Sequence, residues 1–319
     1  MRALPIILAI TWTLSGGGAV VAAAEVRHTP PTFANVPYGT AGRQVLDFWR
    51  AASPGPAPVV LYIHGGGWVQ GDKKSVETDL QGVQGLLDAG ISVAAMNYRF
   101  IQMAQDAKVD PPVRWPLLDA ARALQFLRSQ AAAWNIDRGR IAASGVSAGG
   151  CSSLWLAFHD DLAQPASTDP IARESTRLAC VAVSIAQTSL DPKAMREWTP
   201  NSRYGGHAFG LWDPLDPKTR DTRFDDFLAR RQELLPLIRE FSPIELASPD
   251  DPPVYLAYRS RPAIGKAEAD PTHTANFGVK LQERLVDCKV SCELAYPGAP
   301  RVTHPSVATF LIDALTKAK

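Results

Sequence analysis

Short apolar runs alternate along this chain with longer segments in which apolar residues recur every three or four positions. The short runs contain β-branched residues and end at turn-forming residues, which is typical of buried strands. The longer segments have helical spacing, and the one from Leu117 to Trp134 follows Pro116, a residue suited to a first helical turn. Strands are predicted at Pro58–Ile63, Ile91–Tyr98, Ile141–Ala143, Leu178–Ala186, Val254–Tyr258 and Val290–Tyr296, and further helices at Ala148–Phe158, around Gln282–Val286 and at Ser306–Ala318.

This alternation predicts an α/β fold with a mostly parallel central sheet and helices on both of its faces. Val45–Trp49 has the pattern of an edge strand. Sheets of this kind carry their chemistry at the carboxyl ends of the strands. The polar residues that follow each predicted strand are therefore the candidates for a functional site.

One interval is too long for a connection between a strand and the next helix. Residues 187–252 separate two predicted strands and contain Trp198, Tyr204, Phe209 and Trp212 among Gly and Pro residues. We expect this segment to form a cap over the active edge of a single domain that spans residues 25–319.

The first 24 residues have the pattern of a secretory signal peptide. A short basic start, Met1-Arg2, precedes the apolar run Ala3–Leu14, and Ala22-Ala23-Ala24 matches a cleavage site. The apolar run is too short to cross a bilayer, which takes about 18–20 residues. The sequence therefore predicts a mature chain that begins at Glu25, is exported to the periplasm or medium and has no membrane span.

Charge and cysteine content narrow the function classes. The 33 Lys and Arg residues nearly balance the 32 Asp and Glu residues in a chain of 319. Nucleic-acid-binding domains usually carry a basic face, so this balance argues against a nucleic-acid partner. Four cysteines are too few for a disulfide-built scaffold. In an exported protein they could form the bridges 151–180 and 288–292, one of three possible pairings, or remain as buried thiols.

The segment Gly145-Val146-Ser147-Ala148-Gly149 matches the G-x-S-x-G pattern of a nucleophilic serine. A predicted strand precedes it and a predicted helix follows, which is the sharp turn that exposes a serine oxygen. A side chain at either outer glycine would clash in such a turn. The start of the helix also offers backbone N–H groups to a developing anion.

A second motif, His64-Gly65-Gly66-Gly67-Trp68, directly follows a predicted strand. Glycines let a loop turn its N–H groups inward, where they stabilise the oxyanion of acyl transfer. The Lys and Ser/Thr of a phosphate-binding loop are absent here, as is the G-x-G-x-x-G pattern. We expect His64 to hold the loop by hydrogen bonds and not to act as a base.

With Asn97-Tyr98-Arg99, these two motifs resemble the α/β-hydrolase superfamily, in its esterase and lipase branch with an HGGG loop, close to hormone-sensitive-lipase-like and feruloyl-esterase-like enzymes. The resemblance runs from about Leu46 to the C-terminus. It implies an α/β-hydrolase fold, a Ser-Asp-His triad and an oxyanion hole formed by Gly66, Gly67 and Ala148. It also implies that Tyr98 braces the oxyanion loop.

Chain order then selects the remaining triad members, because acid and histidine follow the serine in this fold. His304 lies between the last predicted strand and the last helix, where the family places its base, and is our first choice. His273 is the alternative. Asp270 follows the strand Val254–Tyr258 and is the preferred acid, with Glu268 as its rival.

Asp250 and Asp251 precede that strand and so lie at the wrong end of it. No metal-binding motif is present, and we expect neither a metal nor a cofactor. The sequence therefore predicts an exported serine hydrolase that cleaves carboxylic esters through an acyl-enzyme, with acetyl or feruloyl esters of carbohydrates as the hypothesis for its substrate class. A serine peptidase of the same fold and a non-catalytic binding module remain as alternatives.

Overall fold

The computed structural model describes residues 29–80, 82–212 and 221–317. The predicted signal peptide and its cleavage site lie outside these ranges. The described chain forms one eight-stranded sheet in the order β1-β2-β4-β3-β5-β6-β7-β8. The strands are β1 (Phe33–Pro37), β2 (Val45–Trp49), β3 (Ala57–Ile63), β4 (Ser92–Met96), β5 (Ile136–Val146), β6 (Cys180–Ser184), β7 (Val254–Ala257) and β8 (Cys292–Ala295).

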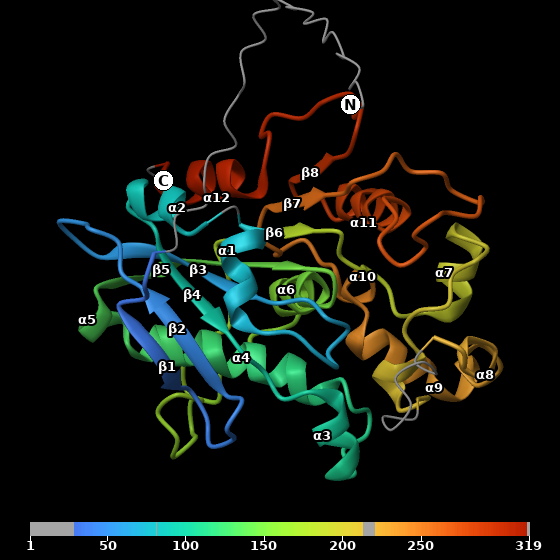
Figure 1. The fold of residues 1–319 in the computed structure, drawn as a ribbon, viewed down its shortest axis with the longest axis horizontal. Helices are drawn as coiled ribbons and strands as arrows, with labels where there is room; N and C mark the ends of the chain where they lie inside the picture. Colours follow the sequence, from blue (N-terminus) through green and yellow to red (C-terminus); the bar gives the residue numbers. More distant parts are fainter. Residues whose placement is uncertain (1–28, 81, 213–220, 318–319) are drawn as a thin grey trace, which may run out of the picture.

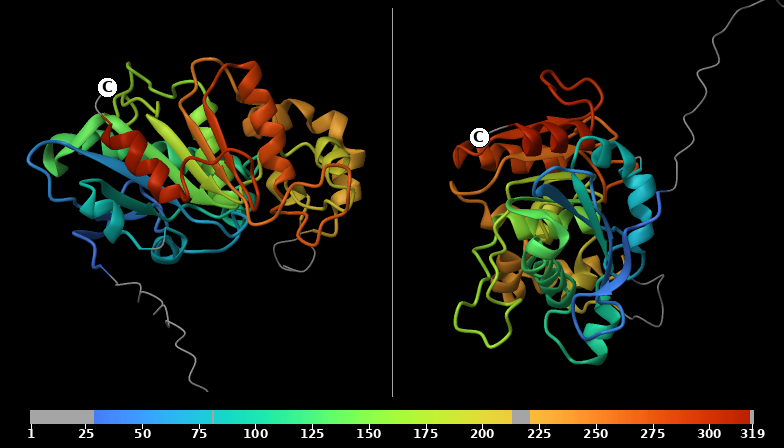
Figure 2. Two further views of the ribbon diagram at one scale, coloured as in Figure 1. Left: turned by 90° about the horizontal axis from the view of Figure 1, so that it is seen from above. Right: turned by 90° about the vertical axis from the view of Figure 1, so that its left-hand side faces the viewer.

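Only the pairs β1–β2 and β2–β4 are antiparallel, so the sheet is mixed and mostly parallel, as predicted. Helices cover both of its faces (Figures 1 and 2). Helices α1 (Val76–Asp79), α2 (Gln84–Asp88) and α12 (Val307–Thr316) pack on one face. The other face carries α4 (Arg114–Ser129), α5 (Ala131–Trp134), α6 (Ala148–Phe158), α10 (Pro243–Leu246) and α11 (Asn276–Asp287).

Each strand places alternate side chains on the two faces, which gives two separate cores. Val59, Leu61 and Ile63 of β3 lie in the larger core, and Val60 and Tyr62 lie in the smaller one. Both sets are fully buried, which explains why β3 is continuously apolar and easy to recognise in the sequence.

The prediction that Val45–Trp49 is an edge strand is wrong. β1 pairs outside it, from Phe33 to Pro37. β1 is mostly exposed or half-buried and contains Asn35 with a positive φ. A strand without a buried face carries no apolar alternation, so nothing in the sequence pattern marked it.

The four cysteines are free thiols in the structure. Cys151 lies in the larger core and Cys180 in the smaller one, on opposite faces of the sheet. A 151–180 bridge is therefore impossible without rearranging the sheet. Cys288 and Cys292 are likewise not bridged to each other. The Cys288 thiol donates a hydrogen bond to the carbonyl oxygen of Ala247, with a sulfur-to-oxygen distance of 3.4 Å.

The described parts of residues 187–252 form α7 (Pro192–Trp198), η2 (Gly206–Phe209), α8 (Phe224–Ala229), α9 (Arg231–Phe241) and α10. Figure 1 shows α7, α8 and α9 grouped at one side of the molecule. The two remaining short elements are η1 (Lys73–Ser75) and α3 (Ile101–Asp106). Across the described ranges, no helix has both the length and the apolar character needed to cross a membrane.

Candidate active site

Ser147 stands in the sharp turn between β5 and α6, with φ 55° and ψ −124°. This backbone conformation is strained for a residue with a side chain and is typical of nucleophilic serines in this type of turn. A Cβ atom on Gly145 would lie 2.5 Å from the Gly149 backbone, and one on Gly149 would lie 2.0 Å from the carbonyl oxygen of Ile63. Both glycines are therefore required by close backbone approach, as predicted.

The glycine loop after β3 lies against this turn. A Cβ atom on Gly65 would stand 2.8 Å from the carbonyl oxygen of Val146. Gly66 and Gly67 have φ values of 105° and 62°, in the region that favours glycine. Both line the pocket that contains Ser147.

Ala148 is the first residue of α6, where backbone N–H groups have no partner within the helix. Gly66 and Gly67 line the pocket that contains Ser147, and Ala148 directly follows Ser147 in the chain. The assignment of these three N–H groups to an oxyanion hole stays a prediction.

His64 and Tyr98 hold the glycine loop in place. The Tyr98 hydroxyl donates to the carbonyl oxygens of His64, at 2.9 Å, and Gly65, at 3.2 Å. The two rings stack with their centroids 4.2 Å apart, and His64 Nδ1 donates to the carbonyl oxygen of Gly65 at 2.7 Å. Burial lowers the pKa of His64 to about 4, so the imidazole is neutral and supports the loop.

The histidine beside Ser147 is His273. Its Nε2 lies 2.9 Å from Ser147 Oγ, and its Nδ1 lies 2.8 Å from Asp270 Oδ2. The carboxylate accepts the Nδ1 proton, which leaves Nε2 to accept the proton of the serine hydroxyl. These contacts form a continuous Ser-His-Asp hydrogen-bond chain.

The prediction that His304 stands beside Ser147 is wrong. His304 Nδ1 lies 2.7 Å from Glu293 Oε2, and its Nε2 lies 3.3 Å from Asp313 Oδ2. The backbone N–H groups of Thr303 and His304 both donate to Glu293 Oε1. These contacts tie the end of the loop after β8 back to β8 and α12, so both nitrogens of His304 face carboxylates and not the serine.

The acid Asp270 lies where the sequence placed it, after β7, although its partner is His273 and not His304. Its rival Glu268 does not reach the imidazole. Glu268 Oε1 accepts a 3.3 Å hydrogen bond from the Thr274 hydroxyl, and its backbone is bonded to the Asn201 side chain.

The segment Asp270-Pro271-Thr272-His273 contained the signal that identifies the base. The His273 N–H donates to the carbonyl oxygen of Asp270 at 3.3 Å, which closes a four-residue turn. In such a turn, the first and last side chains can meet. An acid and a histidine three residues apart after a strand therefore predict a pair without any knowledge of the later loops.

Gln187 supports this turn and was not predicted from the sequence. It is fully buried after β6, and its Nε2 donates to the carbonyl oxygen of Thr272 at 2.7 Å. The Tyr258 hydroxyl bonds the neighbouring carbonyl oxygen of Ala186 at 2.8 Å. A glutamine in a loop can have many roles, so nothing in the sequence around Gln187 indicates that it supports the turn that carries His273.

Ser147 and His273 open into a pocket of about 610 Å³. Thr272 and Ile185 line it from the side of β6 and β7, and Tyr204 lines it from the predicted cap. The cap also reaches the glycine loop, because His207 Nε2 lies 3.1 Å from the carbonyl oxygen of Gly67. In the part of the chain described here, no group of three His, Cys, Asp or Glu side chains is arranged to hold a metal ion.

Comparison with protein families gives a match to the BD-FAE family over residues 46–263. This range includes Ser147 and the glycine loop and ends before Asp270 and His273.

The curated relatives of this chain include two named as an esterase and an ethyl acetate hydrolase. Esterase LipC of Mycobacterium tuberculosis is 27% identical over 242 residues, which cover 71% of this chain and 50% of LipC. The ethyl acetate hydrolase of Pseudomonas putida is 30% identical over 255 residues, covering 77% of this chain and 64% of that protein. This chain therefore spans only half to two-thirds of the length of these two relatives.

Solved structures share the fold. An acetyl ester-xyloside bifunctional hydrolase from Caldicellulosiruptor lactoaceticus matches with a TM-score of 0.57 and 24% identity over 81% of this chain and 78% of that one. A truncated carbohydrate esterase from gut microbiota matches with a TM-score of 0.62 and 18% identity, over 92% of this chain and 99% of that one. Esterase 2 of Thermogutta terrifontis, phosphonylated by sarin, matches with a TM-score of 0.56 and 21% identity, over 80% of this chain and 79% of that one.

Proposed function

We propose that this chain, which belongs to the BD-FAE family, hydrolyses carboxylic esters through an acyl-enzyme on Ser147. The observation that carries the proposal is the hydrogen-bond chain from Ser147 Oγ through His273 to Asp270, at 2.9 and 2.8 Å. It lies in one pocket with the glycine loop, so nucleophile, base and oxyanion donors face the same space.

The reaction follows from this arrangement. Ser147 Oγ attacks the ester carbonyl while His273 Nε2 takes the hydroxyl proton. The backbone N–H groups of Gly66, Gly67 and Ala148 stabilise the oxyanion. His273 then protonates the leaving alcohol, and an acyl-enzyme remains. Water, deprotonated by the same nitrogen, attacks the acyl carbonyl; the bond to Ser147 Oγ then breaks, His273 returns the proton to Oγ, and the acid is released. Asp270 keeps the imidazole in the required tautomer.

Acetyl and feruloyl esters of carbohydrates are the substrate class we propose. BD-FAE denotes bifunctional acetyl and feruloyl esterases, and two of the structural neighbours are named as an acetyl ester-xyloside bifunctional hydrolase and a carbohydrate esterase. The pocket also has room for more than an acetyl group, at about 610 Å³.

Hydrolysis of p-nitrophenyl acetate tests the activity directly. The purified chain should hydrolyse it and should be labelled by a fluorophosphonate probe, whereas Ser147→Ala should do neither. A substrate panel of acetylated xylan, methyl ferulate and aminoacyl p-nitroanilides then defines the class. Cleavage of the anilides alone would indicate a peptidase, and an unlabelled, inactive wild-type chain would indicate a binding module.

We also propose that the chain is exported. The support is the signal-peptide pattern of residues 1–24. N-terminal sequencing of the protein from its native host should find Glu25 in the periplasm or medium. Recovery of Met1 from the cytosol would contradict export.

A further inference from the structure

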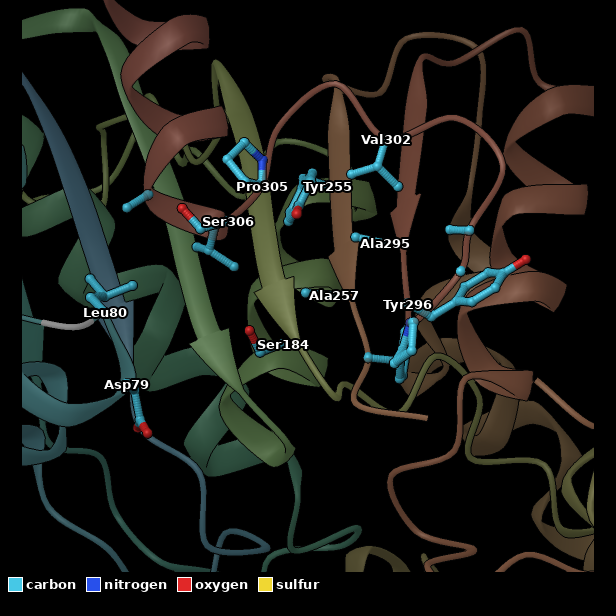
Figure 3. Close-up of a pocket in the computed structure, with 16 residues that line it drawn as sticks. Asp79, Leu80, Ser184, Tyr255, Ala257, Ala295, Tyr296, Val302, Pro305 and Ser306 are labelled. Carbon is cyan, nitrogen blue, oxygen red and sulfur yellow. The ribbon is translucent and has the colours of Figure 1, made fainter. Parts of the chain in front are cut away.

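A second hollow of about 570 Å³ lies beside the active-site pocket, over the carboxyl ends of β6, β7 and β8. We call it the β6–β8 groove. Figure 3 shows it with Asp79 at one end and with Ala257 and Ala295 on the strands that form its floor. Val302 and Pro305, from the loop that joins β8 to α12, form one side of it.

The space above the floor of the groove is open because the floor residues have small side chains. Ser184 of β6, Ala257 of β7 and Ala295 of β8 stand side by side in the sheet register and therefore face the same side. In the backbone register this row continues to Val146 of β5, which precedes the nucleophile and lines the catalytic pocket, although its side chain packs against the larger core. Neighbouring strands lie about 4.8 Å apart, so the row extends roughly 14 Å from β5 to β8.

The groove and the catalytic pocket share a boundary. Asp79 lines both of them. Ser184 lies on the groove floor, and its carbonyl oxygen accepts a 3.0 Å hydrogen bond from the backbone N–H of Ser147. A substrate with its ester bond at Ser147 can therefore extend into the groove.

The order of the strands decides which half of an ester extends there. The glycine loop follows β3, on one side of the nucleophile strand β5, and the floor of the groove lies on β6 to β8, on the other side; α1, which carries Asp79, closes its near end. His273 belongs to the loop that follows β7. Because the oxyanion faces the glycine loop and the leaving oxygen must reach His273, the alcohol half leaves toward the groove.

The lining favours a hydroxylated occupant. Val302 and Pro305 give an apolar side against which the C–H face of a ring can pack, and the Asp79 carboxylate accepts hydrogen bonds and donates none. The Tyr62 hydroxyl donates to one Asp79 oxygen and holds the carboxylate in place. A carboxylate at this point attracts hydroxyl donors and disfavours acidic groups.

We propose that the β6–β8 groove binds the sugar chain that forms the alcohol half of the substrate. This inference rests on the proposed ester hydrolysis and adds to it the position of the carbohydrate. It predicts that blocking the groove raises KM for esters with a large alcohol group and leaves KM unchanged for esters with a small alcohol, whatever their acyl group.

Val302→Trp tests the inference, because Val302 is 39% exposed at the rim and accepts a larger side chain without repacking the core. Val286→Trp makes the same change at a valine of α11 that is 66% exposed and lies outside the groove. Three substrates separate the halves of the ester. Ethyl acetate and acetylated xylo-oligosaccharide share the acyl group, and methyl ferulate combines a large acyl group with a small alcohol.

We expect Val302→Trp to raise KM for the oligosaccharide about tenfold, with less than a twofold change for ethyl acetate and methyl ferulate. Val286→Trp should match the wild type on all three. An unchanged KM for the oligosaccharide would overturn the inference, as would a rise for methyl ferulate alone, which would place the acyl group in the groove.

Binding separates this inference from the proposed activity. Calorimetric titration of Ser147→Ala with acetylated xylo-oligosaccharide should show binding that is weakened by adding Val302→Trp or Asp79→Asn. If the wild type hydrolyses no ester but these variants still weaken binding, the proposed function fails, and the groove remains a carbohydrate-binding site without the assignment to the alcohol half of a substrate. If the wild type is active and both variants bind normally, the groove assignment fails alone.

Discussion

At the scale of single residues, the unusual feature of the site is that one turn carries both acid and base. Asp270 and His273 are three residues apart, and their side chains meet at 2.8 Å. The Asp270 side chain is 64% exposed, whereas that of His273 is 29% exposed. Solvent therefore screens the carboxylate, and we expect it to contribute less than a buried triad acid does.

The identity of the base gives the sharpest prediction at this scale. His273→Ala should lower kcat for p-nitrophenyl acetate by at least ~10³, since it removes the general base and acid from both steps. His304→Ala should retain most of the wild-type kcat. It should also lower the melting temperature, because it leaves Glu293 without the imidazole that stands 2.7 Å away. The opposite pattern of activities would restore His304 as the base.

Amide variants test the acid. A buried triad acid replaced by its amide loses about 10⁴ in turnover. Because Asp270 is largely exposed, we expect Asp270→Asn to lose about 10²–10³, with an unchanged melting temperature. Glu268→Gln is the matched control, two residues away in the same loop, and it should keep wild-type kcat. Full activity of Asp270→Asn would show that Ser147 and His273 work without an acid.

Local sequence determines one half of the site and long-range packing determines the other. Ser147 and the glycines at 66 and 67 lie in short motifs whose glycines are dictated by contacts within a few residues or with the adjacent loop. Both candidate histidines follow a strand, so chain order alone did not separate them. The three-residue spacing of Asp270 and His273 favours His273, whereas no pattern along the chain announces the contact between His304 and Glu293.

At the scale of elements, the catalytic turn is held by the segment that follows β6. Gln187→Met should remove the hydrogen bond to the Thr272 carbonyl and keep the volume of the side chain. We expect kcat to fall up to about tenfold, as one hydrogen bond contributes about 0.5–1.5 kcal/mol, with little change in KM for a small ester. The turn would still form but would hold His273 less accurately.

Thr188→Val is the matched control for Gln187→Met. The Thr188 hydroxyl is also buried and donates to the carbonyl oxygen of Phe277 in α11, at 2.9 Å, away from the catalytic turn. It should lower the melting temperature and leave kcat unchanged. An equal loss of kcat in both variants would show that Gln187 acts only through stability.

The elements that sequence predicted best are the ones buried on both faces. β3, β4 and α6 lie within one or two residues of their predicted limits. The predicted helix through Trp134 is divided at Gln130 into α4 and α5. β1 was missed because a half-exposed strand has no apolar pattern, and its place at the edge depends on pairing with β2.

At the scale of the whole molecule, the buried imidazole of His64 couples pH to stability. It is 1% exposed, and burial lowers its pKa to about 4, below its ordinary value of 6.5. The unfolded chain therefore binds a proton between these two values while the folded chain does not, and stability falls as pH drops from about 6.5 to 4. The full window corresponds to roughly 3 kcal/mol.

Asp251 acts in the opposite direction and must be separated from this effect. Burial raises the pKa of its carboxyl to about 6, so the folded chain binds that proton more readily and gains stability as pH falls through this range. Asp251→Asn removes this contribution and should make the acid-side loss of stability steeper than in the wild type.

Urea unfolding at pH 7.5, 5.5 and 4.5 measures both contributions. In the Asp251→Asn background, the free energy of unfolding should decrease over this range, and His64→Asn should flatten the dependence while lowering stability at pH 7.5. Carboxylates whose pKa is lowered, such as Asp191 beside Arg231, lose their contribution mostly below this range, since their folded pKa lies under 3.8. A dependence that is equally steep with and without His64 would show that the acid sensitivity arises elsewhere in the molecule.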